Sequence, residues 1–79
     1  MMAVVIPIRF GRADAVRRDR IVSVLQSHGY DVRRSDVEGL GELYLLRANA
    51  GLAARGHITE ALHRHVPGWE ADVDFYWPE

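Results

Sequence analysis

The stretch MAVVIPIRF, residues 2–10, decides the fold because it is the most continuously apolar run in the chain. A run this rich in Val and Ile is typical of an interior β-strand that is buried on both faces. Alternation puts Val4, Ile6 and Ile8 on one face and Val5 on the other. Pro7 cannot donate a ladder hydrogen bond, so we expect an irregularity near it. The other elements are expected to cover this strand, which places it in the middle of a sheet.

Five further elements follow from the pattern. They are a helix over 13–28, a charged edge strand over 30–37, an interior strand over 42–48, a helix over 52–65 and a strand over 69–77. Gly29 is expected to end the first helix as a left-handed C-cap, and the Pro67-Gly68 step to end the second. The last stretch, WEADVDFYW, alternates apolar with mostly acidic residues, which predicts a half-buried antiparallel strand.

This order of elements is that of the ferredoxin-like fold, an α+β arrangement written βαββαβ. We expect a four-stranded antiparallel sheet with two helices on one face, formed as a single domain by residues 1–79. The strands 2–10 and 42–48 would be central, and 30–37 and 69–77 would be the edges. A domain of 79 residues without cysteine has a thin core and no disulfide staple, and such domains often gain stability by association.

Charge is unevenly distributed along the chain. Residues 1–34 contain seven Arg and three Asp, whereas residues 35–79 contain three Arg and eight acids. The basic half predicts an arginine patch made of Arg9, Arg12, Arg17, Arg18 and Arg20. Nucleic-acid binding through this patch is a less favoured alternative, because the two central strands offer few stacking aromatics and the acids of the last strand repel phosphate.

Catalytic and cofactor motifs find little support in the residues. None of the serines lies in a G-x-S-x-G elbow, and neither a dinucleotide loop nor a P-loop is present. His63 and His65 would lie about 200° apart around a helix and so could not share a metal ion. Asp72 and Asp74 could form a carboxylate pair, but a solvated strand face is the favoured interpretation. We therefore expect no enzyme activity, no cofactor and no metal.

Two further features of the sequence bear on where the protein lies in the cell. No run approaches the ~20 apolar residues of a membrane span, and residues 1–30 do not read as a signal peptide. We expect a cytoplasmic protein that does not bind membranes.

With those sites set aside, the candidate functional surface is the side of the sheet that carries no helices. Strand 42–48 could present either Leu43 and Leu45 or Tyr44 and Leu46 there, since both sets are apolar. The predicted protein interface is Val5, Tyr44, Leu46, Asp72, Asp74, Tyr76 and Trp77. An apolar centre beside charged residues is typical of a contact surface. The sequence thus favours a small non-catalytic protein-interaction module that forms a homodimer through the open face or by strand addition at strand 69–77.

Such a module would serve as a regulatory subunit or inhibitor of a larger machine, for example one encoded by a phage or plasmid. Two alternatives stay open. Gly11 after the first strand and the Pro67-Gly68 step before the last resemble turns of the regulatory ACT domains. That resemblance implies a small-ligand sensor with a pocket near Gly11 at a dimer interface. The other alternative is a dimeric α+β-barrel enzyme with a cavity between the sheets.

Overall fold

Strand β1 (Val4–Arg9) lies inside the sheet, between β3 and β4. The computed structural model describes residues 4–11, 13–35, 43–48 and 53–78. The other elements are α1 (Ala15–Ser27), β2 (Asp31–Ser35), β3 (Leu43–Ala48), α2 (Ala54–His65), a short 3₁₀ helix η2 (Trp69–Ala71) and β4 (Asp74–Phe75). The βαββαβ order and the ferredoxin-like α+β class are confirmed.

The sheet has the strand order β2-β3-β1-β4, and every neighbouring pair is antiparallel. Strand β1 pairs with β3 along its whole length, from Val4 opposite Ala48 to Arg9 opposite Leu43. The charged β2 and the short β4 are the edges, as predicted.

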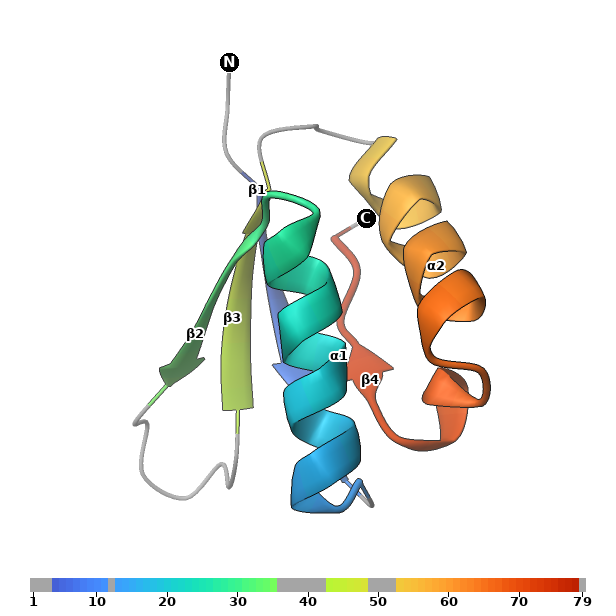
Figure 1. Cartoon of the computed structure of the whole chain (residues 1–79). Coiled ribbons are helices and arrows are strands. Elements are labelled where there is room, and N and C mark those ends of the chain that lie inside the picture. The colour runs from blue at the N-terminus through green and yellow to red at the C-terminus, as the bar shows by residue number, and fades with distance from the viewer. Residues whose placement is uncertain (1–3, 12, 36–42, 49–52, 79) are drawn as a thin grey trace.

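Both helices cover the same face of the sheet (Figure 1). The side chains at the centre of the core are at most 1% exposed, and they are Ile6, Ile8, Ile21, Leu25, Leu46, Ile58, Leu62 and Val66. These come from β1, β3 and both helices, so one core holds the two layers together. Within the described residues, no helix has the length and apolar character needed to cross a membrane.

Helix α1 is bounded by residues suited to helix ends. Asp14 is its N-cap, and the Asp14 carboxylate accepts a hydrogen bond of 2.8 Å from the Arg17 amide. Gly29, at φ 89°, follows the helix in the left-handed conformation and donates to the Gln26 carbonyl. The predicted glycine end of this helix is confirmed.

The prediction of a strand over 69–77 is wrong for most of its length. Trp69–Ala71 form η2, and the strand is reduced to Asp74–Phe75. A strand would place Trp69, Ala71 and Val73 on one face, but only Trp69 and Val73 are buried and Ala71 between them is exposed. The tight turn therefore buries Trp69 and Val73 and leaves Ala71 at the surface.

Pro7 accounts for the early end of the β1–β4 ladder. The register sets Ile8 opposite Phe75, so Tyr76 comes opposite Pro7. The Tyr76 amide donates to the Pro7 carbonyl at 2.9 Å, but Pro7 has no N–H to return the bond. The β1–β3 register runs through Pro7 without a break, so the expected irregularity falls on the β4 side alone.

Candidate functional site

The side chains that point away from the helices form one surface, which we call the helix-free face. Pairing register and alternate burial define its members. They are Val5, Pro7 and Arg9 of β1, Leu43, Leu45 and Arg47 of β3, Asp31, Arg33 and Ser35 of β2, Asp74 of β4, and Tyr76 just after it.

The centre of this face is apolar. Val5, Leu45 and Tyr76 are 46%, 37% and 48% exposed, and each is large. The register places Leu45 opposite Pro7, and Tyr76 is bonded to Pro7 on the other side. An apolar row therefore crosses the sheet from β3 to the edge at β4. Among the described residues one other large apolar side chain is exposed, Val16 on α1.

Charged side chains of both signs surround this row. On the β2 side, the Arg33 Nε atom lies 3.1 Å from the Asp31 Oδ2 atom, and the two side chains are 82% and 48% exposed. Asp31 is also opposite Arg47 in the register. On the β4 side, Arg9 is opposite Asp74. The rim is thus mixed in sign along both edges.

The face is hollowed on its β2 side. Val5 and Leu45 line this hollow together with Asp31, Arg33 and Arg47. Apolar side chains beside two arginines suit an aromatic or acidic side chain of a protein partner.

Of the predicted interface residues, Val5, Asp74 and Tyr76 lie on the helix-free face. Tyr44 and Leu46 do not, which corrects the prediction. Leu46 is 0% exposed, and Tyr44 packs edge-on against Phe10 with ring centroids 5.1 Å apart. Arg47 carries the signal that was missed: it shares its face with Leu43 and Leu45, and a charged residue faces water.

Asp72 and Trp77 are also placed elsewhere. Asp72 lies just after η2 and binds Arg17 of α1 rather than standing beside Asp74 on a strand face. Trp77 stacks on Phe75 with centroids 4.8 Å apart. The Arg55 guanidinium lies 5.3 Å from the Trp77 ring centroid. Trp77 therefore packs between the sheet edge and α2.

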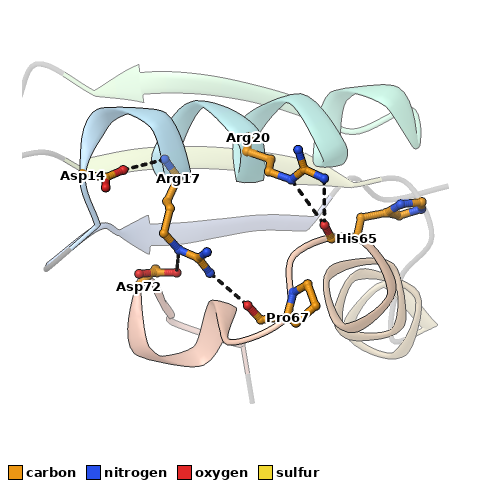
Figure 2. Close-up of polar contacts among 6 residues, drawn as sticks. All are labelled: Asp14, Arg17, Arg20, His65, Pro67 and Asp72. Atoms are coloured by element: carbon orange, nitrogen blue, oxygen red, sulfur yellow. Dashed lines mark hydrogen bonds and ion pairs between the residues drawn. The ribbon is translucent and has the colours of Figure 1, made fainter.

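The predicted basic patch is divided between different surfaces. Arg9 belongs to the helix-free face, whereas Arg17 and Arg20 of α1 reach toward the segment after α2 (Figure 2). Arg18 lies on α1 with its Nε atom 3.7 Å from Asp19, and Arg12 lies outside the described residues.

The side chains of Arg17 and Arg20 form what we call the arginine clasp. The Arg17 Nε atom donates to the Asp72 carboxylate at 2.5 Å, and Arg17 Nη2 donates to the Pro67 carbonyl at 3.0 Å. Arg20 donates through Nε and Nη2 to the His65 carbonyl, both at 3.3 Å. Figure 2 shows both side chains leaving one side of α1 for this segment. Their donors hold α1 to the end of α2 and to η2.

The less favoured chemistries, metal binding and RNA stacking, have no assembled site among the described residues. In the part of the chain that the structure describes, no three His, Cys, Asp or Glu side chains are grouped to hold a metal ion. His63 instead lies 3.3 Å from the Trp69 indole nitrogen. The outward residues of β1 and β3 within the described ranges are aliphatic side chains and arginines, so those strands lack the stacking platform of RNA-binding sheets.

A second hollow lies near Gly11, the residue beside which the alternative of a small-ligand sensor would have its pocket. It is beside Gly11, and its other lining residues are Ala71, Asp72, Val73 and Asp74. Two of its lining residues are aspartates, and the Asp72 carboxylate is already bound by Arg17.

No protein-family model, curated protein or solved structure matches this chain. The helix-free face is therefore the feature of this chain that bears on its function.

Proposed function

We propose that this chain is a small, non-catalytic protein-interaction module that forms a homodimer through its helix-free face. The observation that carries the proposal is the apolar row of Leu45, Pro7 and Tyr76, extended by Val5 and bordered by charge. Protein interfaces share this anatomy, with an apolar centre and a polar rim. Two sheets that pack face to face bury such centres against each other about 10 Å apart.

A second copy is the occupant that the charges favour. The described residues of the face include three arginines, Arg9, Arg33 and Arg47, and two aspartates, Asp31 and Asp74. A surface of mixed sign can be complementary to itself, whereas a surface of one sign needs an opposite partner. The thin core of a 79-residue domain adds a reason to bury further apolar surface.

The face is a better interface than the β4 edge. Strand addition needs a row of unpaired backbone groups. Strand β4 has two residues, so the row that it offers is too short to pair well with an added strand. The β2 edge carries Arg33 and Arg34 among five residues, a pattern that opposes edge-to-edge pairing.

The biological role that fits such a dimer is regulation. A module of this size with no assembled catalytic group among its described residues is suited to act as a regulatory subunit or an inhibitor of a larger assembly. A chain without cysteine suits a reducing compartment, so we place it in the cytoplasm.

Sedimentation equilibrium of Leu45→Asp and Val16→Asp variants tests the proposal. Leu45→Asp buries a charge in the dimer and should leave a folded monomer. Val16→Asp makes the same change at an exposed site on α1 and should remain dimeric. Circular dichroism checks that both variants are folded. A wild-type chain that stays monomeric at the highest concentration reached would overturn the proposal.

The hollow beside Gly11 favours a second candidate, a small-ligand sensor. Thermal-shift measurements against amino acids, polyamines and nucleotides would separate the two functions. A ligand that raises the melting temperature of the wild type, and does so less for Asp74→Asn, supports the sensor. A dimer that no ligand stabilises supports the interaction module.

A further inference from the structure

The sheet register limits how two copies can meet, and this inference rests on the proposed homodimer. We infer that the copies pack face to face about a two-fold axis parallel to the strands. Strand β2 of each copy then lies over β4 of the other, and Arg33 lies beside Tyr76 and Asp74 of the second copy.

Two copies of one sheet can pack face to face in only a small number of symmetric arrangements. Aligned sheet packing keeps the strands of two sheets within about 30° of each other. A two-fold axis between the sheets can then run along the strands or across them. An axis along the strands sets β2 over β4 and β3 over β1 of the second copy. An axis across the strands sets each strand over its own counterpart in reverse direction.

An axis across the strands can superpose the two apolar rows only at the level of these rows, and there it brings like charges together. Arg33, Leu45, Pro7 and Tyr76 share one level of the sheet. An axis at that level puts Arg33 over Arg33 of the second copy. Like charges that face each other across an interface oppose association.

The axis along the strands pairs complementary groups twice. Leu45 lies over Pro7 of the second copy, which closes the apolar centre. Arg33 lies over Tyr76, where a guanidinium can stack on the phenol ring. Asp74 is one same-face position along from Tyr76 on that edge, within reach of a long arginine side chain across a 10 Å gap. The Arg33 side chain is 82% exposed, so it can bind there without leaving a buried position.

The charges along the two edges agree with this arrangement. On the helix-free face β2 presents Arg33 beside Asp31, and the β4 side presents Asp74. These strands are the opposite edges of the sheet. Placing β2 over β4 of the second copy therefore brings Arg33 to Asp74 at both ends of the interface.

A charge exchange between two variants tests the axis. Arg33→Asp and Asp74→Arg are each prepared alone, and dimerisation is measured by sedimentation equilibrium. In each homodimer the exchange sets like charges together at both contacts, so we expect dimer affinity to fall by roughly tenfold or more. In an equal mixture both contacts are complementary again, and a heterodimer should form with affinity within about threefold of the wild type.

Matched controls lie on the helices. Arg64→Asp on α2 and Asp19→Arg on α1 make the same charge changes at side chains that are 69% and 76% exposed. Neither variant should alter dimer affinity. Rescue on mixing also proves that both interface variants are folded, since unfolded chains would not recover a specific dimer.

The outcomes separate the axis from the function. If Arg33→Asp pairs with the wild type as well as it pairs with Asp74→Arg, position 33 faces its own counterpart, the axis lies across the strands, and the inference is overturned while the homodimer stands. Two folded variants that dimerise normally, or that fail to recover on mixing, overturn it as well. A monomeric wild type overturns the proposed function itself.

Discussion

Leu45 and Leu46 are identical neighbours on β3 with opposite surroundings. Leu46 is 0% exposed beneath the helices, whereas Leu45 is 37% exposed on the helix-free face. The pleat of the strand produces this difference, because successive side chains point to opposite faces. One side chain therefore contributes to folding, and the other is available for association.

Alanine substitutions at these two sites should differ in their effect on stability. Leu46→Ala leaves a cavity in the core and should lower the free energy of unfolding by about 2–5 kcal/mol. Leu45→Ala should lower it by less than about 1 kcal/mol, measured by urea denaturation at a concentration where the chain is monomeric. Equal losses at the two positions would contradict the assignment of the β3 faces.

Tyr30 should make the free energy of unfolding depend on pH, and a single substitution can isolate its contribution. Burial raises the pKa of the Tyr30 phenol above 10.0. The folded state therefore holds the phenolic proton more tightly, and the stabilisation is complete below pH 10 and is lost as pH rises through the folded-state pKa. The chain has no Lys or Cys, the other residue types whose ordinary pKa values lie near this range.

Replacing Tyr30 with Phe should remove most of this loss. Urea denaturation across the alkaline range is expected to show a smaller fall in the free energy of unfolding for Tyr30→Phe than for the wild type. Tyr76→Phe, at a half-exposed position, is the control and should behave like the wild type. A Tyr30→Phe variant with the full alkaline loss would assign the effect to another group.

The residues of the helix-free face could be predicted only in part. The pattern of β1 assigns Val5 to the outer face correctly, since Ile6 and Ile8 are the stronger core candidates. The pattern of β3 is apolar on both sides from Leu43 to Leu46 and so decides nothing over those positions. Arg47 and Ala48, which follow, distinguish the faces, because a charged side chain faces water and a small apolar one packs well under a helix.

At the level of elements, the arginine clasp joins α1 to the chain after α2. We expect Arg17→Met and Asp72→Asn each to lower the free energy of unfolding by about 1–3 kcal/mol, since the first removes the hydrogen bonds of Arg17 and the second removes the charge that strengthens the bond to Asp72. The double variant should lose less than the two single losses together, because both act on the same contact. Urea denaturation of the four proteins measures this coupling.

The control for the clasp is Arg64→Met. Arg64 pairs with Glu60 within α2 at 3.1 Å, and both side chains are about 70% exposed. Such pairs contribute about 0.3–0.5 kcal/mol, so this variant should be close to the wild type. A loss as large as that of Arg17→Met would show that arginine removal alone, rather than the clasp, destabilises the chain.

Two glycines should respond in opposite ways to alanine. Gly68 has φ 82° just before η2, a conformation that costs an L-residue about 1–2 kcal/mol. Gly56 lies within α2, and a Cβ atom there would meet nothing within 4 Å. Gly56→Ala should therefore raise the free energy of unfolding by about 0.5–1 kcal/mol, and Gly68→Ala should lower it. Thermal unfolding of the two variants checks both signs.

The short β4 shows where element prediction fails. The sequence WEADVDFYW alternates well enough for a strand, but alternation is a local property. Strand length here depends on a residue far away in sequence, Pro7, which cannot complete the hydrogen-bond pair with Tyr76. The left-handed Gly68 and the clasp on Asp72 then favour a turn over residues 68–72. The existence and order of the elements could be predicted, whereas this boundary depended on tertiary contacts.

The molecule as a whole has two different sides, because the helices cover one face of the sheet and the helix-free face lies on the other. The described chain measures 33 × 31 × 21 Å along its principal axes, as expected for one layer of helices on one sheet. The core fills the space between these layers, and none of the described helices covers the other side of the sheet (Figure 1). A face-to-face dimer would form four layers, with the two sheets inside and the helices outside.

A homodimer of this kind makes thermal stability depend on protein concentration. Association that occurs only in the folded state stabilises it by mass action, so the melting temperature of the wild type should rise as the concentration is increased in scanning calorimetry. The Leu45→Asp variant should melt at one temperature throughout, because its folded monomer has no such equilibrium. Val16→Asp should retain the wild-type dependence. If Leu45→Asp shows the same rise as the wild type, association uses another surface, because the charge at position 45 would oppose any contact that covers the helix-free face.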